Sequence, residues 1–283
     1  MSTFYQNKIV LITGAASGIG LALSKELLKF GSTVYMADIN LELVRDEAKK
    51  LGSKANAIEL DVVNRINFQK VVEHILDQCE RIDFLFNNAG IGYAGETFGY
   101  SFEDWDKIID VNLKGGINGT AIIYPIMKSQ GAGHIIFTAS IAGLVPSAML
   151  VPYATSKHAI VGMSRSLRLE ATLYNIQVSV LCPGTIETPM LDNCTPLDMD
   201  EHLSINAREY LSSITGKPIS TEKFAKKALI GISKNRELIF YPKKAKEIWR
   251  LSRFFPRVLK GLATKALNGL RKKQSSRTMN GFE

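Results

Sequence analysis

The chain has 283 residues, of which 46% are hydrophobic and 22% charged, and its mean hydropathy is +0.02. This composition excludes a disordered chain, and no apolar run approaches the ~20 residues that a membrane-spanning helix needs. The formal net charge of +8 is concentrated in residues 241–283, where twelve Lys and Arg stand against two acids, so the rest of the chain is not polybasic.

Short apolar runs alternate with longer amphipathic stretches along residues 1–240. The apolar runs predict seven strands, at 8–13, 33–38, 55–61, 82–87, 134–140, 177–182 and 237–241. The stretches between them predict helices, one ending near residue 30 and others over 41–51, 65–79, 101–129, 153–174 and 220–233.

Continuous apolar strands joined by helices indicate a parallel sheet that is covered on both faces. We therefore predict a single doubly wound, Rossmann-type α/β domain with a mostly parallel seven-stranded sheet, over residues 1–240. Residues 241–283 are predicted to form a separate basic extension.

A glycine-rich turn joins the first predicted strand to the helix after it. Its sequence is TGAASGIG over 13–20, which spaces Gly14, Gly18 and Gly20 as GxxxGxG. Glycines at such a turn let the backbone approach a pyrophosphate, which then sits at the helix N-terminus. A bare tight turn also needs glycine for steric reasons, but the flanking strand and helix favour a dinucleotide site.

Asp38 ends the second predicted strand, 20 residues after Gly18. A carboxylate there can accept hydrogen bonds from the adenosine ribose and repels a 2′-phosphate. The same residue precedes a helix and is also placed to be its N-cap. Because residues 35–42 contain no Arg or Lys, NAD is favoured over NADP as the cofactor. Asp61, at the end of the third strand, stays open between a turn cap and an adenine contact.

Three residues further along can carry acid–base chemistry if they meet. Ser140 ends the fifth predicted strand, Tyr153 follows it, and Lys157 lies four residues after Tyr153. Positions i and i+4 share one face of a helix, so the phenol and the ammonium are predicted to be neighbours. A nearby cation depresses the pKa of a phenol, which can then exchange a proton with an alcohol or carbonyl. Taken alone, this spacing is better explained by a surface lysine packed along a tyrosine.

Together these residues make the chain resemble the short-chain dehydrogenase/reductase family over about residues 4–240. The shared motifs, in the family's order, are TGAASGIG at 13–20, Asp38, Asp61-Val62, NNAG at 87–90, Asn112, Ser140, YATSK at 153–157 and PGTIET at 183–188. The resemblance implies an NAD(P)-dependent enzyme that acts on CH–OH groups. It also implies that Tyr153 is the general acid/base and that Lys157 binds the nicotinamide ribose and lowers the pKa of Tyr153.

The resemblance implies roles for further residues. Ser140 and Tyr153 would hold the substrate, and Asn112 would hold a water that links Lys157 to solvent. The implied cofactor contacts are Gly14, Ser17, Gly18, Ile19, Gly20, Asp38, Asp61, Val62, Asn88, Ala89, Gly90, Tyr153, Lys157, Pro183, Gly184, Ile186 and Thr188. Family members commonly pair through the helices at about 101–129 and 153–174, which implies a homodimer or homotetramer.

The expected substrate site is surrounded by apolar residues. Residues 144–151 are almost wholly apolar, and residues 188–216, which cover the substrate in the family, mix apolar with acidic side chains. This lining favours a lipophilic alcohol or ketone, although the same residues can pack on the substrate segment whatever the ligand. The expected reaction is reversible hydride transfer between a secondary alcohol and its ketone. The alternatives are a catalytically silent nucleotide-binding regulator and a membrane-docked interaction protein on the same fold.

The basic extension is amphipathic after Pro256. Apolar residues between Val258 and Leu270 occupy one half of the helical wheel, and basic and polar residues occupy the other. Such a helix can lie on an anionic membrane, or its apolar stripe can dock on the body or on a second subunit. It carries no groove-reading motif, so nucleic acid is not expected as a partner.

Other chemistries are not indicated. The three cysteines include no CxxC pair, and the opening residues lack a signal-peptide pattern, so we expect a cytoplasmic protein without disulfides. The four histidines show no metal-ligand spacing, and neither a GxxxxGK[ST] phosphate loop nor a GxSxG nucleophile elbow is present. We therefore expect no metal.

Overall fold

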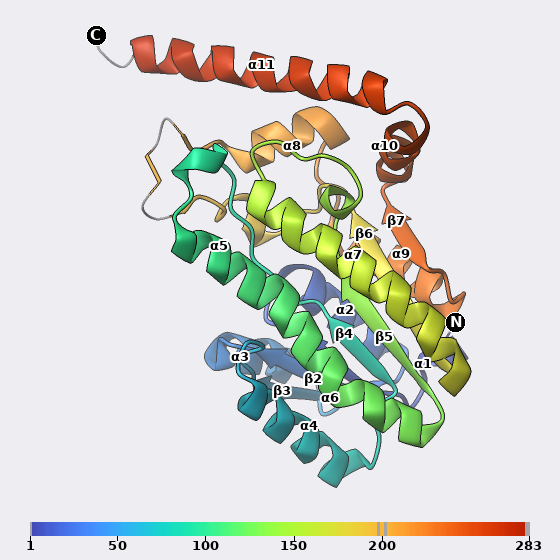
Figure 1. Ribbon diagram of the computed structural model, residues 1–283. Coiled ribbons are helices and arrows are strands. Elements are labelled where there is room, and N and C mark those ends of the chain that lie inside the picture. The colour runs from blue at the N-terminus through green and yellow to red at the C-terminus, as the bar shows by residue number, and fades with distance from the viewer. Residues whose placement is uncertain (1, 197–198, 201–202, 281–283) are drawn as a thin grey trace.

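The computed structural model describes residues 2–196, 199–200 and 203–280. Its seven strands form one sheet in the order β3-β2-β1-β4-β5-β6-β7, and every neighbouring pair is parallel (Figure 1). The strands are β1 (Ile9–Thr13), β2 (Thr33–Asp38), β3 (Ala55–Glu59), β4 (Phe84–Asn87), β5 (Gly133–Thr138), β6 (Ile176–Pro183) and β7 (Leu238–Tyr241). The strand order reverses at β1, which lies between β2 and β4, and this confirms the predicted doubly wound Rossmann-type sheet.

Helices cover both faces of the sheet. They are α1 (Ser2–Tyr5), α2 (Gly18–Lys29), α3 (Leu41–Leu51), α4 (Arg65–Cys79), α5 (Phe102–Ile109), α6 (Gly115–Gln130), α7 (Val151–Ala171), α8 (Ala207–Thr215), α9 (Thr221–Ser233), α10 (Lys243–Phe254) and α11 (Pro256–Asn280). Leu23 of α2 and Phe224 of α9 are fully buried in one apolar core, and Phe68 of α4 and Met127 of α6 are fully buried in the other. The continuous apolar strands are explained by this double burial.

The helical stretch predicted over 101–129 is interrupted. α5 runs into a π-helical turn, η2 (Asp110–Lys114), before α6 begins. Short 3₁₀ segments elsewhere are η1 (Thr97–Gly99), η3 (Ile141–Gly143), η4 (Thr172–Tyr174) and η5 (Pro189–Leu191). A π turn inserts one extra residue into a helix and occurs frequently at functional sites. Here it holds Asn112, whose side chain is buried.

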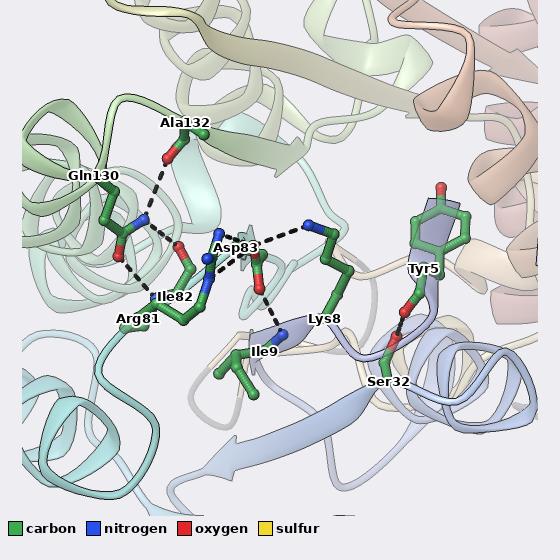
Figure 2. A network of polar contacts seen from close by, with 9 residues as sticks. All are labelled: Tyr5, Lys8, Ile9, Ser32, Arg81, Ile82, Asp83, Gln130 and Ala132. Carbon is green, nitrogen blue, oxygen red and sulfur yellow. Dashed lines mark hydrogen bonds and ion pairs between the residues drawn. The ribbon is translucent and has the colours of Figure 1, made fainter. Parts of the chain in front are cut away.

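A buried carboxylate fastens the amino-terminal edge of the sheet (Figure 2). Asp83 is 7% exposed and accepts hydrogen bonds from the Ile9 amide at 2.9 Å, Lys8 Nζ at 3.2 Å and Arg81 Nη2 at 2.6 Å. Charge-assisted bonds of this kind are stronger than neutral ones. They pin the starts of β1 and β4, at the edge opposite the strand ends that carry the glycine-rich turn.

Segments from the two ends of residues 1–240 meet on one face of the sheet. α9 packs along α2, and Tyr5 of α1 is fully buried beside them. The Tyr5 hydroxyl donates to the carbonyl oxygen of Leu229 at 2.7 Å, and its ring stacks on Phe30 with centroids 5.7 Å apart. The Ser32 hydroxyl donates to the Tyr5 carbonyl at 2.7 Å (Figure 2). Residues 5 and 229 therefore belong to one packed unit.

The basic extension forms two helices, α10 and α11, and α11 passes over α8 (Figure 1). Trp249 of α10 stacks on Phe240 of β7, with ring centroids 5.1 Å apart. Within the described residues no helix is both long and apolar enough to cross a bilayer. Residues 281–283 of the predicted extension lie outside the described residues.

The apolar stripe of α11 is divided between the body and solvent. Leu259, Leu267 and Leu270 are half-buried against apolar clusters of the body. Val258 and Leu262 are 52% and 56% exposed. Docking therefore accounts for Leu259, Leu267 and Leu270, whereas Val258 and Leu262 face outward.

Candidate active site

The glycine-rich turn closes tightly between β1 and α2. Gly14 has a φ of +66°, and a Cβ there would stand 2.8 Å from the Cα of Ala89. A Cβ on Gly20 would stand 2.1 Å from the carbonyl oxygen of Gly14. Side chains are excluded at both positions, so the backbone itself forms the surface of this turn. Ser17 is the N-cap residue of α2, but its side chain makes no capping hydrogen bond to the first backbone N–H groups.

Asp38 lies at the end of β2, next to this turn. One carboxylate oxygen accepts from the Ala16 amide at 3.0 Å, and the other accepts from the Asn40 amide at 3.0 Å. The N-cap of α3 is Asn40, whose side chain accepts from the Leu43 amide at 3.0 Å. The capping role considered for Asp38 therefore falls to Asn40, because α3 begins two residues later than that role requires.

Thr13 and Thr138, at the ends of β1 and β5, form hydrogen bonds that connect the glycine-rich turn to Asn88 and Ala89 after β4. Thr13 Oγ1 accepts from the backbone amides of Asn88 and Ala89, each at 3.0 Å. The Asn88 side-chain amide donates to the carbonyls of Thr13 at 3.0 Å and Gly14 at 3.2 Å, and its oxygen accepts from Thr138 Oγ1 at 3.0 Å. The sequence reasoning did not single out Thr13 or Thr138, because a threonine at a strand end carries no distinguishing signal.

Asp61 and Val62 follow β3 and form a turn beside α6. Asp61 Oδ1 accepts from the Val63 amide at 3.0 Å, so its carboxylate caps a turn. Val62 is 7% exposed, and its carbonyl accepts from Asn118 Nδ2 at 2.9 Å. A Cβ on Gly115 would stand 2.7 Å from a methyl of Val62, so α6 holds this loop closely.

Ser140, Tyr153 and Lys157 lie together in the structure. β5 ends at Thr138, two residues before the predicted strand end, so Ser140 is the N-cap residue of η3, while Tyr153 and Lys157 belong to α7. The Ser140 hydroxyl acts on the Tyr153 phenol and favours its ionised form, which lowers the pKa of the phenol. Lys157 Nζ lies 5.5 Å from the centroid of the Tyr153 ring and donates to the Thr138 carbonyl at 2.9 Å. Lys157 is 3% exposed, so its ammonium is held inside the protein. The i, i+4 spacing therefore produces the predicted neighbourhood of phenol and ammonium.

Asn112 approaches Lys157 from the π turn. Its amide nitrogen donates to the Ile91 carbonyl at 2.9 Å and to Ser156 Oγ at 3.0 Å, and its oxygen accepts from the Ile91 amide at 2.8 Å. A Cβ on Gly90 would stand 3.1 Å from Asn112 Oδ1 and 3.2 Å from Lys157 Nζ. The same glycine therefore faces both side chains, and a larger residue would press on both.

Burial dominates the protonation of the tyrosine–lysine pair. It lowers the pKa of Lys157 from 10.5 to about 8, because the charged form loses its hydration. Burial also raises the pKa of Tyr153 above its ordinary value of 10.0, and the Ser140 hydroxyl opposes that rise. The sequence expectation of a depressed Tyr153 pKa is therefore wrong for this structure, because desolvation by burial has the largest effect and raises that pKa.

The segment after β6 lies against the glycine-rich turn. The Gly184 amide, next to Pro183, donates to the Tyr241 carbonyl at 3.0 Å. Ile186 is 4% exposed and forms an isolated parallel bridge with Ile219. A Cβ on Gly18 would stand 3.3 Å from the Thr188 methyl, so residues 183–188 pass directly over the start of α2.

The predicted apolar segment between Ser140 and Tyr153 divides between two clusters. Val145 is 6% exposed and packs with Ile141 and Ala245. Met149 and Leu150 are 4% and 6% exposed and pack on residues of α8. Met149 has a φ of +64°, an uncommon conformation for a residue with a side chain, and its carbonyl accepts from the hydroxyl of Tyr100 at 3.2 Å.

An arginine of α8, Arg208, bonds two carboxylates in the segment that follows β6. Arg208 Nε donates to Asp192 at 2.8 Å, and Nη1 donates to Glu187 at 2.9 Å. Its guanidinium holds the pKa of both carboxyls below their ordinary values. Because Glu187 lies between Ile186 and Thr188, Arg208 links α8 to the wall of the expected nicotinamide site.

Comparison with known proteins decides the family. A family model for short chain dehydrogenase matches residues 8–197, more than half of the chain. The chain belongs to the short-chain dehydrogenase/reductase family. It is 39% identical over 190 residues to the 3-oxoacyl-acyl-carrier-protein reductase FabG of Thermotoga maritima, covering 66% of this chain and 77% of that protein.

Two further relatives of this short-chain dehydrogenase extend the comparison. A cyclopentanol dehydrogenase of a Comamonas strain is 35% identical over 187 residues, covering 65% of this chain and 75% of that protein. The solved structure of a short-chain dehydrogenase/reductase from Burkholderia phymatum in complex with NAD matches with a TM-score of 0.82 at 26% identity, covering 90% of this chain and 95% of that chain. The protein is therefore an oxidoreductase that acts on CH–OH groups of small molecules.

The turn of this short-chain dehydrogenase fits a dinucleotide. Gly14 and Gly20 keep its surface free of side chains, and Ser17 leaves the first N–H groups of α2 uncapped. Asp38 stands at the neighbouring strand end, as a ribose contact requires. Within the part of the chain that the structure describes, no group of three or more His, Cys, Asp or Glu is placed to hold a metal ion.

Proposed function

We propose that the protein catalyses reversible, NAD-linked hydride transfer between a secondary alcohol and its ketone. The observation that carries the proposal is the convergence of Ser140, Tyr153 and buried Lys157 beside a glycine-rich dinucleotide turn. When bound, the nicotinamide supplies the site that accepts or donates hydride. Tyr153 exchanges the hydroxyl proton as general acid/base, and Ser140 orients the substrate oxygen.

Lys157 and Asn112 complete the proposed catalytic set. Lys157, whose Nζ lies 5.5 Å from the centroid of the Tyr153 ring, is proposed to bind the nicotinamide ribose beside that tyrosine. Asn112 holds the Ile91 backbone beside Lys157 and is proposed to position a water that carries protons to solvent.

We propose that both the cofactor site and the substrate site belong to the single domain 1–240, and that 241–283 is an extension of it.

Further side chains are proposed to bind the cofactor. Residues of the turn and the strand ends would hold its phosphates and adenosine: Gly14, Ser17, Gly18, Ile19, Gly20, Asp38, Asp61 and Val62. Residues nearer the catalytic set would hold the nicotinamide half: Asn88, Ala89, Gly90, Tyr153, Lys157, Pro183, Gly184, Ile186 and Thr188. The passage of Thr188 over Gly18 supports a single site that spans both groups.

The activity is tested by following the absorbance of reduced nicotinamide over a panel of secondary alcohols and ketones. Wild type is expected to turn over members of the panel, and Tyr153→Phe is expected to lose at least a hundredfold of that rate. Tyr124→Phe is the matched control, because the Tyr124 hydroxyl has no partner within the described residues. Wild type that binds NAD yet turns over no panel member would favour the catalytically silent regulator.

NAD is the proposed cofactor in preference to NADP. The carboxylate of Asp38 stands where a 2′-phosphate would meet like-charge repulsion, and residues 35–42 supply no Arg or Lys to offset it. Calorimetry is expected to show tighter binding of NAD than of NADP, with a narrower gap for Asp38→Ala. Equal affinities in wild type would contradict this preference.

The proposed substrate is lipophilic. Met149 and Leu150 present a buried apolar wall, and the Tyr153 ring packs on the same cluster. Gly92 faces both the Tyr153 ring and Met190. Within the alcohol panel, kcat/KM is expected to be higher for aliphatic and alicyclic alcohols than for polyols of equal size. A preference for polyols would contradict this part of the proposal.

We also propose that the enzyme is a cytoplasmic homodimer or homotetramer whose extension, 241–283, contacts anionic membranes. Phe254 and Phe255 are 72% and 61% exposed beside exposed Val258 and Leu262, and basic residues surround them. Each basic residue near an anionic leaflet contributes ~1 kcal/mol, and exposed aromatic side chains can enter the interface. Light scattering measures the oligomeric state.

Vesicle sedimentation tests the membrane contact. The full chain is expected to bind vesicles that contain phosphatidylserine at low salt and to bind neutral vesicles much less. Phe254→Ser with Phe255→Ser should weaken this binding severalfold. A matched pair at other exposed apolar positions, Ile66→Ser with Leu173→Ser, should not. Equal binding to neutral vesicles would contradict an electrostatic contact.

A further inference from the structure

The C-terminal helix reaches the substrate side of the molecule. α11 runs over α8 (Figure 1). Ala207 and Tyr210 of α8 belong to one apolar cluster with Leu150, the N-cap residue of α7. Leu267 and Leu270 of α11 are half-buried on this cluster, and the ring of Tyr153 packs on the same cluster. The buried members of this cluster are Ala94, Met149, Leu150, Cys194, Ile205, Ala207 and Tyr210.

An ion pair joins α11 to the body one residue after Leu270. The Arg271 guanidinium donates to one carboxylate oxygen of Glu96, from Nη2 at 2.7 Å and from Nε at 2.9 Å. The two residues are 175 positions apart in the chain, so the pair is a tertiary contact. A hydrogen-bonded guanidinium and two leucines together give the helix one defined position.

Glu96 belongs to a short backbone segment, residues 94–96, that hydrogen bonds to two other segments around the expected substrate site. Its amide donates to the Leu203 carbonyl at 2.9 Å, and the Gly95 amide donates to the Met149 carbonyl at 2.8 Å. The Ala94 amide donates to the Cys194 carbonyl at 2.7 Å. Arg271 therefore connects α11 to residues 94–96, and these residues hydrogen bond both to Met149 and to the 188–216 segment.

We propose that α11 is the roof of the substrate site and selects alcohols whose apolar portion extends away from the carbinol carbon under Leu267 and Leu270. The inference rests on the proposed alcohol–ketone activity, and it assigns to the extension a part in substrate recognition. Leu267, Leu270 and Tyr153 all pack against this cluster. In the proposal the two leucines bind the remote part of the substrate, and Tyr153 and Ser140 bind the reacting atoms. Binding of that kind is the same in ground and transition states, so it lowers KM and leaves kcat.

The test is a chain-length series of 2-alkanols with the full-length enzyme. Each methylene buried under the roof is expected to raise kcat/KM about fourfold, through KM. Leu267→Ser with Leu270→Ser should flatten this dependence. Val258→Ser with Leu262→Ser, on the same helix but 52% and 56% exposed, should keep it.

A charge reversal gives a second measurement that does not disturb the apolar packing. Arg271→Glu should raise KM for the longest alcohols severalfold, and the double change Glu96→Arg with Arg271→Glu should restore much of the loss. Wild type that turns over no alcohol would overturn both the proposed activity and the roof. Wild type that is active without a chain-length dependence, or roof variants that keep the wild-type dependence, would overturn the roof alone.

Discussion

Replacing the buried lysine of the catalytic set should stabilise the protein while it removes activity. Burial lowers the pKa of Lys157 from 10.5 to about 8, and each tenfold change in a protonation equilibrium corresponds to ~1.4 kcal/mol. Keeping this ammonium charged inside the fold therefore costs roughly 3 kcal/mol at pH 7. Lys157→Met keeps the apolar stem and gives up the bond to the Thr138 carbonyl, worth about 1 kcal/mol. The variant should be more stable by about 2 kcal/mol.

The pH dependence of this difference follows from linkage. Between pH 8 and 10.5 the unfolded chain binds more protons at Lys157 than the folded chain, so wild-type stability rises with pH across that window. At pH 10 the buried lysine costs wild type only about 1 kcal/mol of stability, and the hydrogen bond that Lys157→Met loses is worth about the same amount. Wild type and Lys157→Met should then unfold at nearly the same urea concentration.

Urea unfolding without added cofactor, at pH 7 and pH 10, measures both values. Lys70→Met, at an exposed lysine of α4, controls for removal of a positive charge. A Lys157→Met variant that is less stable than wild type at pH 7 would refute the reasoning. So would a stability difference that is the same at both pH values.

Three further predictions concern contacts around the site. Gly20→Ala would place a methyl 2.1 Å from the Gly14 carbonyl, so calorimetry should show at least tenfold weaker NAD binding, whereas Gly162→Ala, with open space around it, should bind as wild type does. Asn88→Ala removes three side-chain hydrogen bonds and should lower the free energy of unfolding by about 3 kcal/mol in urea titrations. Arg208→Met releases two carboxylates, so proteolysis within 188–216 should quicken severalfold; an unchanged cleavage rate would argue against that tether.

Local patterns predicted the parts of the structure that depend on near neighbours. Alternating strands and helices predicted the sheet, and the i, i+4 rule predicted that Tyr153 and Lys157 meet. The pKa of Tyr153 was mispredicted, because the depth of burial is a property of the whole packed site. Asn112 came only from the family resemblance, since a π turn has nearly the periodicity of an α-helix and its partner Ile91 is 21 residues away.

The position of the extension also depends on contacts between residues far apart in the sequence, which a local pattern cannot show. Its amphipathic pattern predicted a helix with an apolar stripe, and α11 has one. The pattern could not show which residues are covered, and Leu267 and Leu270 differ from Val258 and Leu262 only in what the rest of the chain places beneath them. The partner of Arg271 lies 175 residues earlier, beyond any pattern within a helix.

The contact between Tyr5 and Leu229 has a consequence for how the chain acquires its structure during synthesis. The face of β1 that packs under α2 is completed by α9, and the Tyr5 hydroxyl is satisfied by a carbonyl of α9. Until residues 221–233 leave the ribosome, that face exposes apolar side chains such as Leu23 and Leu27, which are fully buried in the finished fold. At 5–20 residues per second, the interval from residue 29 to residue 233 lasts roughly 10–40 s. The nascent chain therefore has a long period in which chaperones can bind it, because the contact between Tyr5 and Leu229 joins residues 224 positions apart.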